Sequence, residues 1–322
     1  MTKAETTFWQ LLKRRFGDSC WLNEPLWRHT AYRVGGPADA FIKPATLQDL
    51  QEVIHWCYRE GVPFQVLGKG ANVLVHDRGY RGVILSLETC CGDIRRKGRV
   101  LTVGAGVPVQ KLVAYCEERG LAGLQFMSGI PGTVGGALMM NAGAFGGEIG
   151  DRVLWVEALN RQGRRRRISR EQAGFGYRRA TGLRDLILLG CRLHLEEGSP
   201  DQLRQQRQAI VLRREKNQPL DYPSCGSVFK RPPGEYAGRL IERAGAKGLR
   251  VGGAMVSPKH ANFILNVAGA TARDIFHLIV TVQQRVYRQT GVWLAPEVKF
   301  IGFSEQELQQ LEKPENGTTS EG

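Results

Sequence analysis

The feature that most constrains the fold is a glycine-rich stretch, MSGIPGTVGGALMMNAGAFGGEIG, at residues 127–150. Eight glycines lie from Gly129 to Gly150, with few charged side chains among them. Positions without a Cβ leave little side chain to pack and much bare backbone, which suits close approach by a large, flat, phosphate-bearing ligand. We therefore expect this stretch to be a ligand-binding loop.

A second glycine turn, GKGAN at 68–72, lies between two apolar segments that are expected to be strands. Consecutive backbone N–H groups in glycine-permitted conformations can form a nest for a pyrophosphate. Taken alone, this turn fits a plain hairpin equally well. Neither loop matches the P-loop pattern or the dinucleotide fingerprint G-x-G-x-x-G. In the first loop, Val73 stands where the last glycine of the fingerprint belongs. The sequence therefore indicates neither a P-loop nucleotidase nor a Rossmann dehydrogenase.

The chain carries a formal net charge of +14. Such a charge favours acidic partners, which include nucleic acid, an anionic membrane surface and small molecules with phosphate groups. The densest basic run, RQGRRRRISR at 161–170, contains no aromatic residue and surrounds Gly163 between two apolar stretches. We interpret it as the solvated tip of a hairpin, in preference to a nucleic-acid patch.

Seven cysteines form an odd set without a C-x-x-C pair, and several lie in apolar runs. This usage is typical of reduced cytosolic thiols, and neither a disulfide framework nor a metal site is expected. Residues 1–20 carry mixed charges where a signal peptide needs an apolar segment, and nowhere do 18 apolar residues run together. We therefore expect a soluble, cytoplasmic protein that does not bind a membrane.

At 322 residues the chain is about twice the usual domain length, and its predicted strands and helices indicate an α+β fold. We expect a lead segment, a first domain of two subdomains, a smaller α+β C-terminal domain and a disordered tail. The expected boundaries are 1–27, then 28–196 with subdomains of about 28–88 and 89–196, then 197–303, then 304–322.

Capping residues locate two helices. Thr46 with Asp49 begins one, and Thr271 with Asp274 begins the other. Apolar residues at helical spacing follow each pair. A third helix, rich in Arg and Gln at 200–215, is expected to link the two domains.

Six motifs, in order along the chain, carry a resemblance to a known family. They are YRVGGPA at 32–38, VLGKGANVLV at 66–75, GIPGTVGGALMMNAGA at 129–144, FGYR at 175–178, YPSCGSVFKRP at 222–232 and LAPEV at 294–298. The first three resemble the FAD-binding domain of the vanillyl-alcohol-oxidase, or PCMH, type. Together the six are similar to the UDP-N-acetylenolpyruvoylglucosamine reductase family, in the compact branch that lacks an extra tyrosine-bearing loop. The resemblance spans roughly residues 27–303.

The resemblance implies a flavoprotein oxidoreductase of peptidoglycan synthesis, with noncovalent FAD and NADPH. It would reduce UDP-N-acetylglucosamine enolpyruvate to UDP-N-acetylmuramate, with hydride passing from the flavin to the vinyl carbon. Residues of both glycine loops would bind FAD. They are Leu67, Gly68, Lys69, Gly70, Ala71, Asn72, Val73, Gly129, Ile130, Pro131, Gly132, Thr133, Gly135, Gly136, Asn141, Gly143 and Ala144.

The resemblance also implies three catalytic residues. Hydride addition beside a carboxylate creates an enolate-like intermediate, so the site needs a cation on the carboxylate, a second polar group and a proton donor. Arg178 matches the family's carboxylate-binding arginine, Ser227 its proton donor and Glu297 its catalytic glutamate. The planar guanidinium of an arginine suits a carboxylate and stays charged throughout turnover.

Further candidates are implied for binding of the substrate. They are Tyr177, Lys216, Lys230 and Arg231. Many relatives have a lysine directly before the QPL step, where this chain has Asn217, so the lysine that binds the substrate phosphate stays open. Cys225, two residues before Ser227, raises the alternative of thiol catalysis. Because no histidine lies nearer in sequence than His260, we interpret Cys225 as a packing residue.

Two other functions stay open at this stage. One is a sugar or alcohol oxidase on the same flavin fold. Such enzymes commonly attach FAD through His or Cys, and neither residue occurs in the loops 68–72 and 129–150. The other is a basic nucleic-acid-binding protein, led by 161–170, which would leave both glycine loops without a role. The expected partners are therefore NADPH and the nucleotide sugar, without nucleic acid or membrane.

Overall fold

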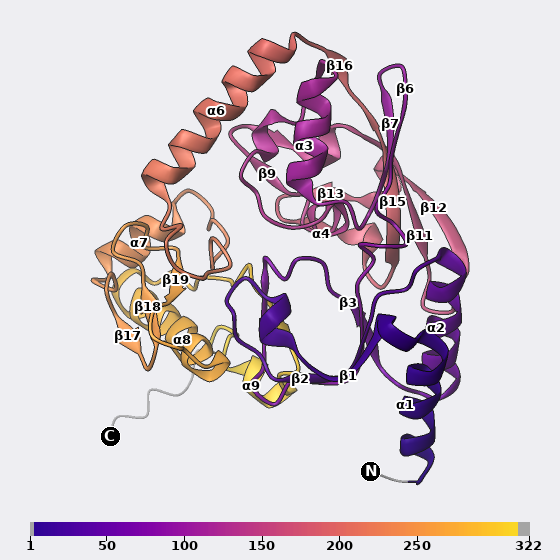
Figure 1. Cartoon of the computed structure of the whole chain (residues 1–322). Coiled ribbons are helices and arrows are strands. Elements are labelled where there is room, and N and C mark those ends of the chain that lie inside the picture. The colour runs from indigo at the N-terminus through magenta and orange to yellow at the C-terminus, as the bar shows by residue number, and fades with distance from the viewer. Residues whose placement is uncertain (1–2, 315–322) are drawn as a thin grey trace. The chain divides into compact units, whose positions relative to one another are not determined.

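The computed structural model describes residues 3–314, and the chain forms two compact units. Unit 1 contains Met1–Glu24, Ala38–Gly70 and Tyr80–Lys216, and unit 2 contains Pro25–Pro37, Ala71–Gly79 and Asn217–Gly322. The chain thus passes between the units several times (Figure 1). The expected domains, 28–196 and 197–303, are each continuous, whereas 25–37 and 71–79 belong to unit 2 and the helix at 200–215 belongs to unit 1.

Unit 1 begins with a four-stranded sheet and two helices. The strands are β1 (Cys20–Pro25), β2 (Pro37–Ile42), β5 (Tyr80–Leu85) and β3 (Phe64–Val66) in spatial order, and the helices are α1 (Lys3–Phe16) and α2 (Leu47–Arg59). β5 pairs in parallel with both β2 and β3. Leu12 and Phe16 of α1 share a buried core with Leu50 of α2 and Leu85 of β5. Residues 3–24 of the expected lead segment (1–27) are therefore an integral part of unit 1, and residues 25–27 belong to unit 2.

Both capping predictions are confirmed. The Thr46 Oγ1 accepts the Asp49 N–H at 3.1 Å, and the Asp49 carboxylate accepts the Thr46 N–H at 3.1 Å, at the start of α2. Thr271 and Asp274 form the same reciprocal pair at the start of α8 (Ala272–Thr290). Each pair satisfies N–H groups that the helix itself leaves unbonded.

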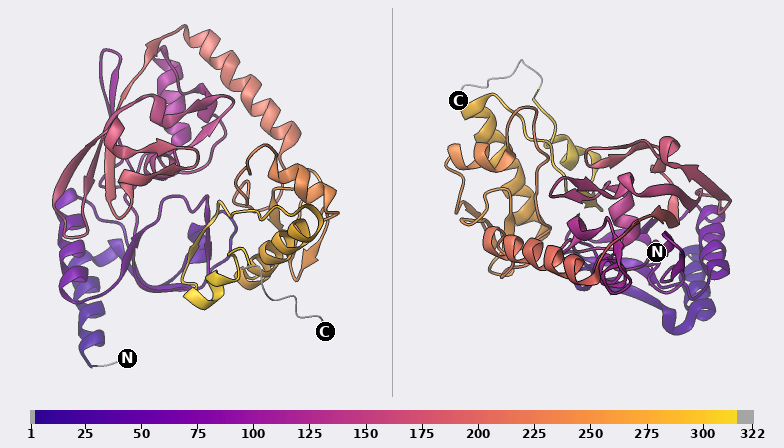
Figure 2. Two further views of the ribbon diagram at one scale, coloured as in Figure 1. Left: turned by 180° about the vertical axis from the view of Figure 1, so that it is seen from behind. Right: turned by 90° about the horizontal axis from the view of Figure 1, so that it is seen from above.

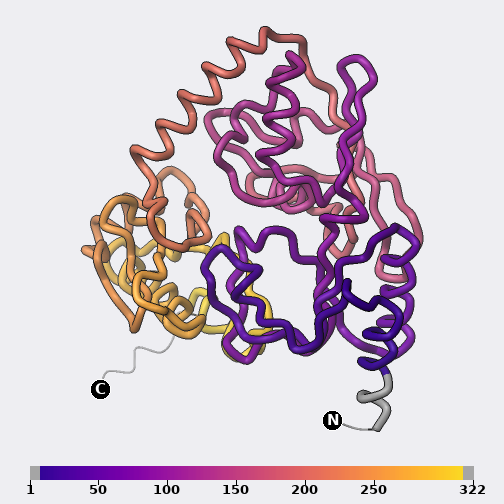
Figure 3. Tube along the Cα trace, in the orientation of Figure 1, coloured from indigo at the N-terminus to yellow at the C-terminus, as the bar shows by residue number. Residues whose placement is uncertain are grey.

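The second sheet of unit 1 is antiparallel and five-stranded. In spatial order its strands are β12 (Arg165–Ser169), β11 (Val153–Leu159), β15 (Ile187–His194), β7 (Val100–Gly104) and β6 (Ile94–Lys97). Figure 3 shows the chain path through the β6–β7 hairpin. The apolar run of β15 is buried between β11 and β7. α3 (Val109–Glu118) and α4 (Val134–Met139) contribute Leu112 and Leu138 to the same core.

Short elements complete unit 1. They are the strand pairs β8 (Leu121–Ala122) with β16 (Glu196–Glu197), β9 (Gly143–Ala144) with β10 (Gly147–Glu148) and β13 (Phe175–Gly176) with β14 (Arg179–Ala180), the helix α5 (Arg170–Ala173), and the 3₁₀ helices η1 (Gly17–Ser19), η3 (Gln125–Met127), η4 (Ile149–Asp151) and η5 (Thr181–Leu183). The long helix α6 (Pro200–Asn217), salmon in Figures 1 and 2, is the predicted helix at 200–215. In the described part of the chain, no helix combines the length and the apolar character that a membrane span requires.

The arginine-rich run 161–170 forms a hairpin, as the sequence predicts. β11 and β12 are its arms, and Gly163 in the turn has a φ of 77°. Arg167 is exposed, yet its guanidinium lies 4.4 Å from the centre of the Trp155 ring. The facing strand thus supplies an aromatic partner that the run itself lacks.

Unit 2 is assembled from three stretches of chain. β4 (Val73–Val75) pairs in parallel with β20 (Lys299–Ile301), and β17 (Arg250–Val251), β18 (Ala254–Val256) and β19 (Ile264–Asn266) form an antiparallel sheet. The helices are η2 (Leu26–His29), α7 (Ala237–Arg243), α8 and α9 (Glu305–Gln309). Tyr32 and Leu74 are fully buried in a core with Ile275 and Ile279 of α8. These contacts explain why 25–37 and 71–79 belong with the C-terminal part of the chain.

The expectation of a disordered tail at 304–322 is wrong for its first residues. Ser304 caps α9, and the Leu311 carbonyl accepts a hydrogen bond from Trp293 Nε1 at 3.0 Å. The polar residues of this segment include a capping box of Ser304 and Glu307, and the hydrogen bond to the Leu311 carbonyl fixes its backbone. Residues 315–322 lie outside the described residues.

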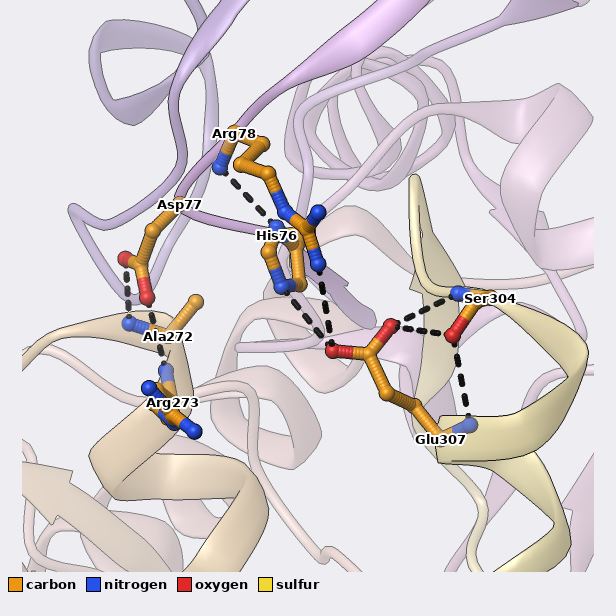
Figure 4. A network of polar contacts seen from close by, with 7 residues as sticks. All are labelled: His76, Asp77, Arg78, Ala272, Arg273, Ser304 and Glu307. Atoms are coloured by element: carbon orange, nitrogen blue, oxygen red, sulfur yellow. Dashed lines mark hydrogen bonds and ion pairs between the residues drawn. The ribbon is translucent and has the colours of Figure 1, made fainter.

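A polar network joins residues 76–78 to the C-terminal part of unit 2 (Figure 4). The backbone N–H of Arg78 donates to His76 Nδ1 at 2.9 Å, so Nε2 carries the hydrogen that it donates to Glu307 Oε1 at 3.2 Å. His76 is only 7% exposed. Hydrogen bonds from Ser304 lower the pKa of Glu307 below its usual range, which keeps this acceptor ionised at neutral pH.

Asp77 caps α8 from a distant part of the sequence (Figure 4). Its carboxylate accepts the N–H groups of Ala272 at 2.8 Å and Arg273 at 3.0 Å. A negative charge at the N-terminus of a helix is favourable in addition to the hydrogen bonds. Asp77 therefore fixes the segment 71–79 to the longest helix of unit 2.

We expect Asp77→Ala to lower the free energy of unfolding by about 2 kcal/mol, because it leaves two N–H groups of α8 without their acceptors. Thermal unfolding and hydrogen exchange at the Ala272 and Arg273 amides would measure this loss. Asp93→Ala is the matched control, since Asp93 is exposed and its carboxylate forms an ion pair with the exposed Arg95. Equal unfolding midpoints for the two variants would contradict the capping role.

Candidate active site

Unit 1 contains a cavity of about 420 Å³ whose wall includes both glycine loops. Gly68 comes from the first loop and Leu67 directly precedes it, and Thr133, Gly135 and Gly136 come from the second loop. This volume lies in the range of cofactor and ligand pockets. The two loops selected from the sequence therefore face one space.

The two loops touch where only glycine fits. A Cβ on Gly68 would lie 2.6 Å from Thr133 Oγ1, which is too close for atoms that are not bonded. Thr133 cannot easily move away, because its Oγ1 caps α4 by accepting the Gly136 N–H. The close approach leaves bare peptide groups at the cavity surface, which suits a ligand with phosphates.

The rest of the wall is largely apolar, with one ion pair between residues that sequence reasoning missed. Leu87 and Ile187 are among the apolar residues, and Arg161 Nη2 lies 3.1 Å from Asp185 Oδ1. Strand register would have found this pair, because Leu159 pairs with Ile187 and the two charged residues lie just beyond it. From the sequence alone, Arg161 belongs to the predicted solvated tip of a hairpin.

The cavity fits FAD in its chemistry. Bare peptide groups beside apolar walls suit a flat ring system that is joined to phosphates. Among the described residues that line the cavity there is no histidine or cysteine, the side chains that commonly attach a flavin covalently.

Other predicted FAD-binding residues lie in the loops without lining the cavity. Lys69 Nζ pairs with Glu88 Oε1 at 3.1 Å, and Glu88 itself lines the cavity. The remaining ones outside the wall are Gly70, Ala71, Asn72, Val73, Gly129, Ile130, Pro131, Gly132, Asn141, Gly143 and Ala144. Their contact with FAD stays a prediction.

Asn141 is buried, and the protein uses its side chain. Its Nδ2 donates to Glu148 Oε2 at 2.6 Å and to the Gly176 carbonyl at 3.2 Å, and its Oδ1 accepts the Gly150 N–H at 3.0 Å. These bonds use both N–H groups of the amide and its oxygen. Asn141 therefore holds the glycine-rich loop to β13, and its side chain is not available to a ligand in this arrangement.

Arg178 lies in the two-residue turn between β13 and β14, in unit 1. Its Nη1 donates to the Gly143 carbonyl at 3.0 Å, and its guanidinium lies 5.5 Å from the centre of the Tyr177 ring. Its backbone is left-handed, with a φ of 53°. This conformation costs about 1–2 kcal/mol for a residue other than glycine, and such strain is concentrated at functional sites.

Ser227 and Glu297 lie in unit 2, on segments whose backbones are paired. The Glu297 N–H donates to the Val228 carbonyl at 2.7 Å, and Ser227 forms an antiparallel bridge with Phe263. Both Ser227 and Glu297 are half-buried. Two of the three predicted catalytic residues thus lie on paired, neighbouring segments of unit 2, and the third, Arg178, belongs to unit 1.

Asn72, of the first glycine turn, fixes the Glu297 segment. Its Nδ2 donates to the Glu297 carbonyl at 3.1 Å, and its own carbonyl accepts the Lys299 N–H at 3.0 Å. A residue predicted to bind FAD therefore acts on the backbone beside a predicted catalytic residue.

Asn262 holds the Ser227 segment and was not selected from the sequence. Its Oδ1 accepts the Phe229 N–H at 3.0 Å, its Nδ2 donates to the Phe229 carbonyl at 2.9 Å, and its own carbonyl accepts the Val228 N–H at 2.8 Å. The side-chain amide of Asn262 thus makes the two hydrogen bonds to the Phe229 backbone that a neighbouring strand would otherwise make. The sequence signal is weak, because it is one asparagine inside the apolar stretch ANFIL.

The predicted substrate-binding residues are accessible to different extents. Tyr177 is 50% exposed, Lys216 is exposed near the end of α6, and Lys230 is half-buried. The guanidinium of Arg231 lies 4.0 Å from the centre of the Tyr236 ring. Their contact with a substrate stays a prediction.

The interpretation of Cys225 as a packing residue is confirmed. Its side chain is buried, and its Sγ donates to the Val73 carbonyl at 3.3 Å. Burial raises the pKa of the Cys225 thiol to about 12, so this thiol is protonated at neutral pH. A protonated, buried thiol is a poor nucleophile.

We expect iodoacetamide to alkylate Cys225 in the folded protein at least about 1,000-fold more slowly than in the denatured chain at about pH 8, because so little thiolate is present. The rate should rise about tenfold per pH unit up to about pH 10, where an ordinary thiol already levels off. Peptide mapping by mass spectrometry after timed labelling measures both. Equal rates in the folded and denatured protein would reopen the case for thiol catalysis.

Two sequence families match the chain. The family described as the C-terminal domain of UDP-N-acetylenolpyruvoylglucosamine reductase matches residues 218–301, and the FAD binding domain family matches residues 38–169. The second range includes both glycine loops. The predicted α+β fold with an FAD-binding domain and a smaller C-terminal domain is confirmed, and so is FAD as the cofactor.

Proteins named UDP-N-acetylenolpyruvoylglucosamine reductase are similar over most of the chain. The one from Exiguobacterium sibiricum is 43% identical, and the match covers 87% of this chain and 92% of the relative. The one from Heliobacterium modesticaldum is 42% identical, covering 91% of this chain and 94% of the relative.

A solved structure agrees. The crystal structure of UDP-N-acetylenolpyruvylglucosamine reductase from Thermus caldophilus has a TM-score of 0.76 and 35% sequence identity, covering 88% of this chain and 98% of that chain. The resemblance carried by the six motifs is thereby confirmed. The chain belongs to the UDP-N-acetylenolpyruvoylglucosamine reductase family.

Proposed function

We propose that this protein reduces UDP-N-acetylglucosamine enolpyruvate to UDP-N-acetylmuramate, the activity of a UDP-N-acetylmuramate dehydrogenase. The observation that carries the proposal is that relatives named as reductases of this kind match about nine-tenths of both chains. The glycine-walled cavity supports it, because it offers a place for FAD within the FAD-binding domain. The positive net charge favours the binding of anionic nucleotides.

Arg178 binds the substrate carboxylate in this proposal. Once NADPH has reduced it, the bound flavin would supply the hydride. Hydride adds to the terminal vinyl carbon, and the electron pair of the double bond moves to the carbon beside the carboxylate. The guanidinium of Arg178 stabilises that negative charge through charge-assisted hydrogen bonds.

Ser227 completes the reduction by giving its hydroxyl proton to the carbon beside the carboxylate. A hydroxyl is a weak acid, so this transfer requires a strongly basic acceptor, which the carbanion provides. Lys230 stabilises the serine alkoxide until a proton from solvent replaces the one lost. Glu297 is the second polar group that holds the substrate carboxylate in this proposal.

Ser227→Ala is expected to leave flavin reduction by NADPH unchanged and to slow flavin reoxidation by the enolpyruvyl sugar by about 10²–10⁴-fold, the usual contribution of a general acid. Anaerobic stopped-flow absorbance measures the two half-reactions separately. Ser224→Ala is the matched control, because Ser224 lies on the same segment and has no part in the proposed chemistry.

The same spectra test the proposed function itself. The purified wild-type protein should be yellow, bleach with NADPH and recover its colour with the enolpyruvyl sugar. A wild-type protein that reoxidises only with oxygen would be an oxidase instead. A colourless protein that takes up no added FAD and binds DNA in a salt-sensitive manner would be a nucleic-acid-binding protein.

Gly68→Ala should weaken FAD binding by at least about tenfold, because the new methyl group would force Gly68 and Thr133 apart at the cavity wall. FAD titration followed by flavin fluorescence measures the dissociation constant. Gly238→Ala is the control, since a Cβ there meets no atom closer than 3.7 Å. Equal affinity in the two variants would show that the contact between the loops does not shape the FAD site.

A further inference from the structure

One face of α6 lies against the rest of unit 1. Leu203 is buried, and Arg207, one turn further on, places its Nε 2.5 Å from Glu117 Oε2 of α3. Arg214 follows seven residues after Arg207, on the same face of the helix. This face of α6 thus ends in the guanidinium of Arg214. The preceding cation on the same face, Arg207, is already paired with the carboxylate of Glu117.

The Arg214 side chain lies against the glycine-rich loop, and it has no acidic partner among the described residues. A Cβ on Gly129 would lie 2.6 Å from Arg214 Cδ and 3.2 Å from its Nε, so the side chain lies directly against the glycine-rich loop. The Nε is buried and has no hydrogen-bond partner among the described residues. No described carboxylate forms an ion pair with Arg214. A buried donor without an acceptor is costly unless a ligand supplies one.

The aromatic partner of Arg214 is itself strained. Phe145 and Gly146 form the turn between β9 and β10, with φ of 52° and 87°. A left-handed phenylalanine costs about 1–2 kcal/mol. This conformation places the half-exposed ring 5.2 Å from the guanidinium of Arg213 and 5.3 Å from that of Arg214. The turn thus holds the ring of Phe145 against the guanidiniums of Arg213 and Arg214.

Arg178 reaches the same loop from another side. Its Nη1 donates to the carbonyl of Gly143, two residues before Phe145. Burial lowers the pKa of Arg214 below its usual value, and the positive charge of Arg178 lowers it further. Arg178 and Arg214 thus both contact the segment 143–145, and an anion bound beside that segment would be attracted by both positive charges.

We propose that Arg214 and Arg178 together form one oxyanion-binding site, and that Arg214 is a binding residue for the substrate carboxylate. This inference rests on the proposed function, in which Arg178 holds that carboxylate. An oxyanion accepts from several guanidinium N–H groups at once, which satisfies the buried Nε of Arg214. A phosphate of NADPH has the same chemistry, and the two half-reactions distinguish the two sources.

The test is Arg214→Met, which keeps an unbranched apolar side chain against Gly129 and Phe145. We expect the KM for the enolpyruvyl sugar to rise about 10–100-fold, as for the loss of a charge-assisted hydrogen bond. The concentration dependence of flavin reoxidation should shift equally, while flavin reduction by NADPH stays unchanged. A shift in the NADPH half-reaction instead would assign the site to a phosphate of the nucleotide.

Two further variants keep the inference falsifiable. Arg214→Lys retains the charge but not the planar fork, and it should show a smaller rise in KM, of about 3–10-fold. Arg213→Met is the matched control, because Arg213 is exposed and also contacts Phe145. Unchanged kinetics in both half-reactions for folded, FAD-loaded Arg214 variants would overturn the inference. If Arg214→Met does not fold, the lysine variant alone decides it.

This outcome is distinct from failure of the proposed function. A wild-type protein that never oxidises NADPH with the enolpyruvyl sugar overturns the proposed function. A wild-type protein that does so, while its Arg214 variants match it in both half-reactions, overturns only the anion site.

Discussion

The close approach of side chains to bare backbone, which the missing Cβ of glycine permits, is the constraint on which unit 1 depends. Gly68 lies against Thr133, Gly129 lies against Arg214, and each position would clash if it carried a Cβ. At Gly68 the bare backbone forms part of the cavity wall, and at Gly129 it lies beside Arg214. Polar side chains then fix the bare loop, with Asn141 as the clearest case. The functional features of this unit are thus arranged around backbone, and the side chains serve mainly to hold that backbone in place.

Unit 2 shows the same principle with amides in place of glycines. Asn262 satisfies both backbone groups of Phe229, and Asn72 bonds to the carbonyl of Glu297. Neither asparagine carries chemistry in the proposed reaction. Their hydrogen bonds fix the segments of Ser227 and Glu297 before a ligand arrives, which lowers the entropy lost when the reacting groups are aligned.

Local patterns in the sequence predict the features that depend on neighbouring residues. The capping pairs at Thr46 and Thr271, the hairpin at 161–170 and both glycine loops are of this kind. Family motifs identify the fold and the cofactor, because such motifs record tertiary constraints. Features that depend on distant pairing were missed. Asn262 and the Arg161–Asp185 pair become visible only once strands are in register, and the anchoring of Leu311 depends on hydrogen bonds from Trp293 and from Gln283 of α8.

The threading of the chain through unit 2 has a consequence for its synthesis. Tyr32 emerges from the ribosome early, yet its core partners in α8 follow some 240 residues later, as Ile275 and Ile279 do. β4 likewise cannot pair until β20, its parallel partner near the end of the described chain, has been synthesised. Two early segments therefore remain without their apolar partners during most of translation, and they need protection from aggregation until then. Because unit 2 is built from three separate stretches of the chain, no single cut in the gene releases it as a complete folding module.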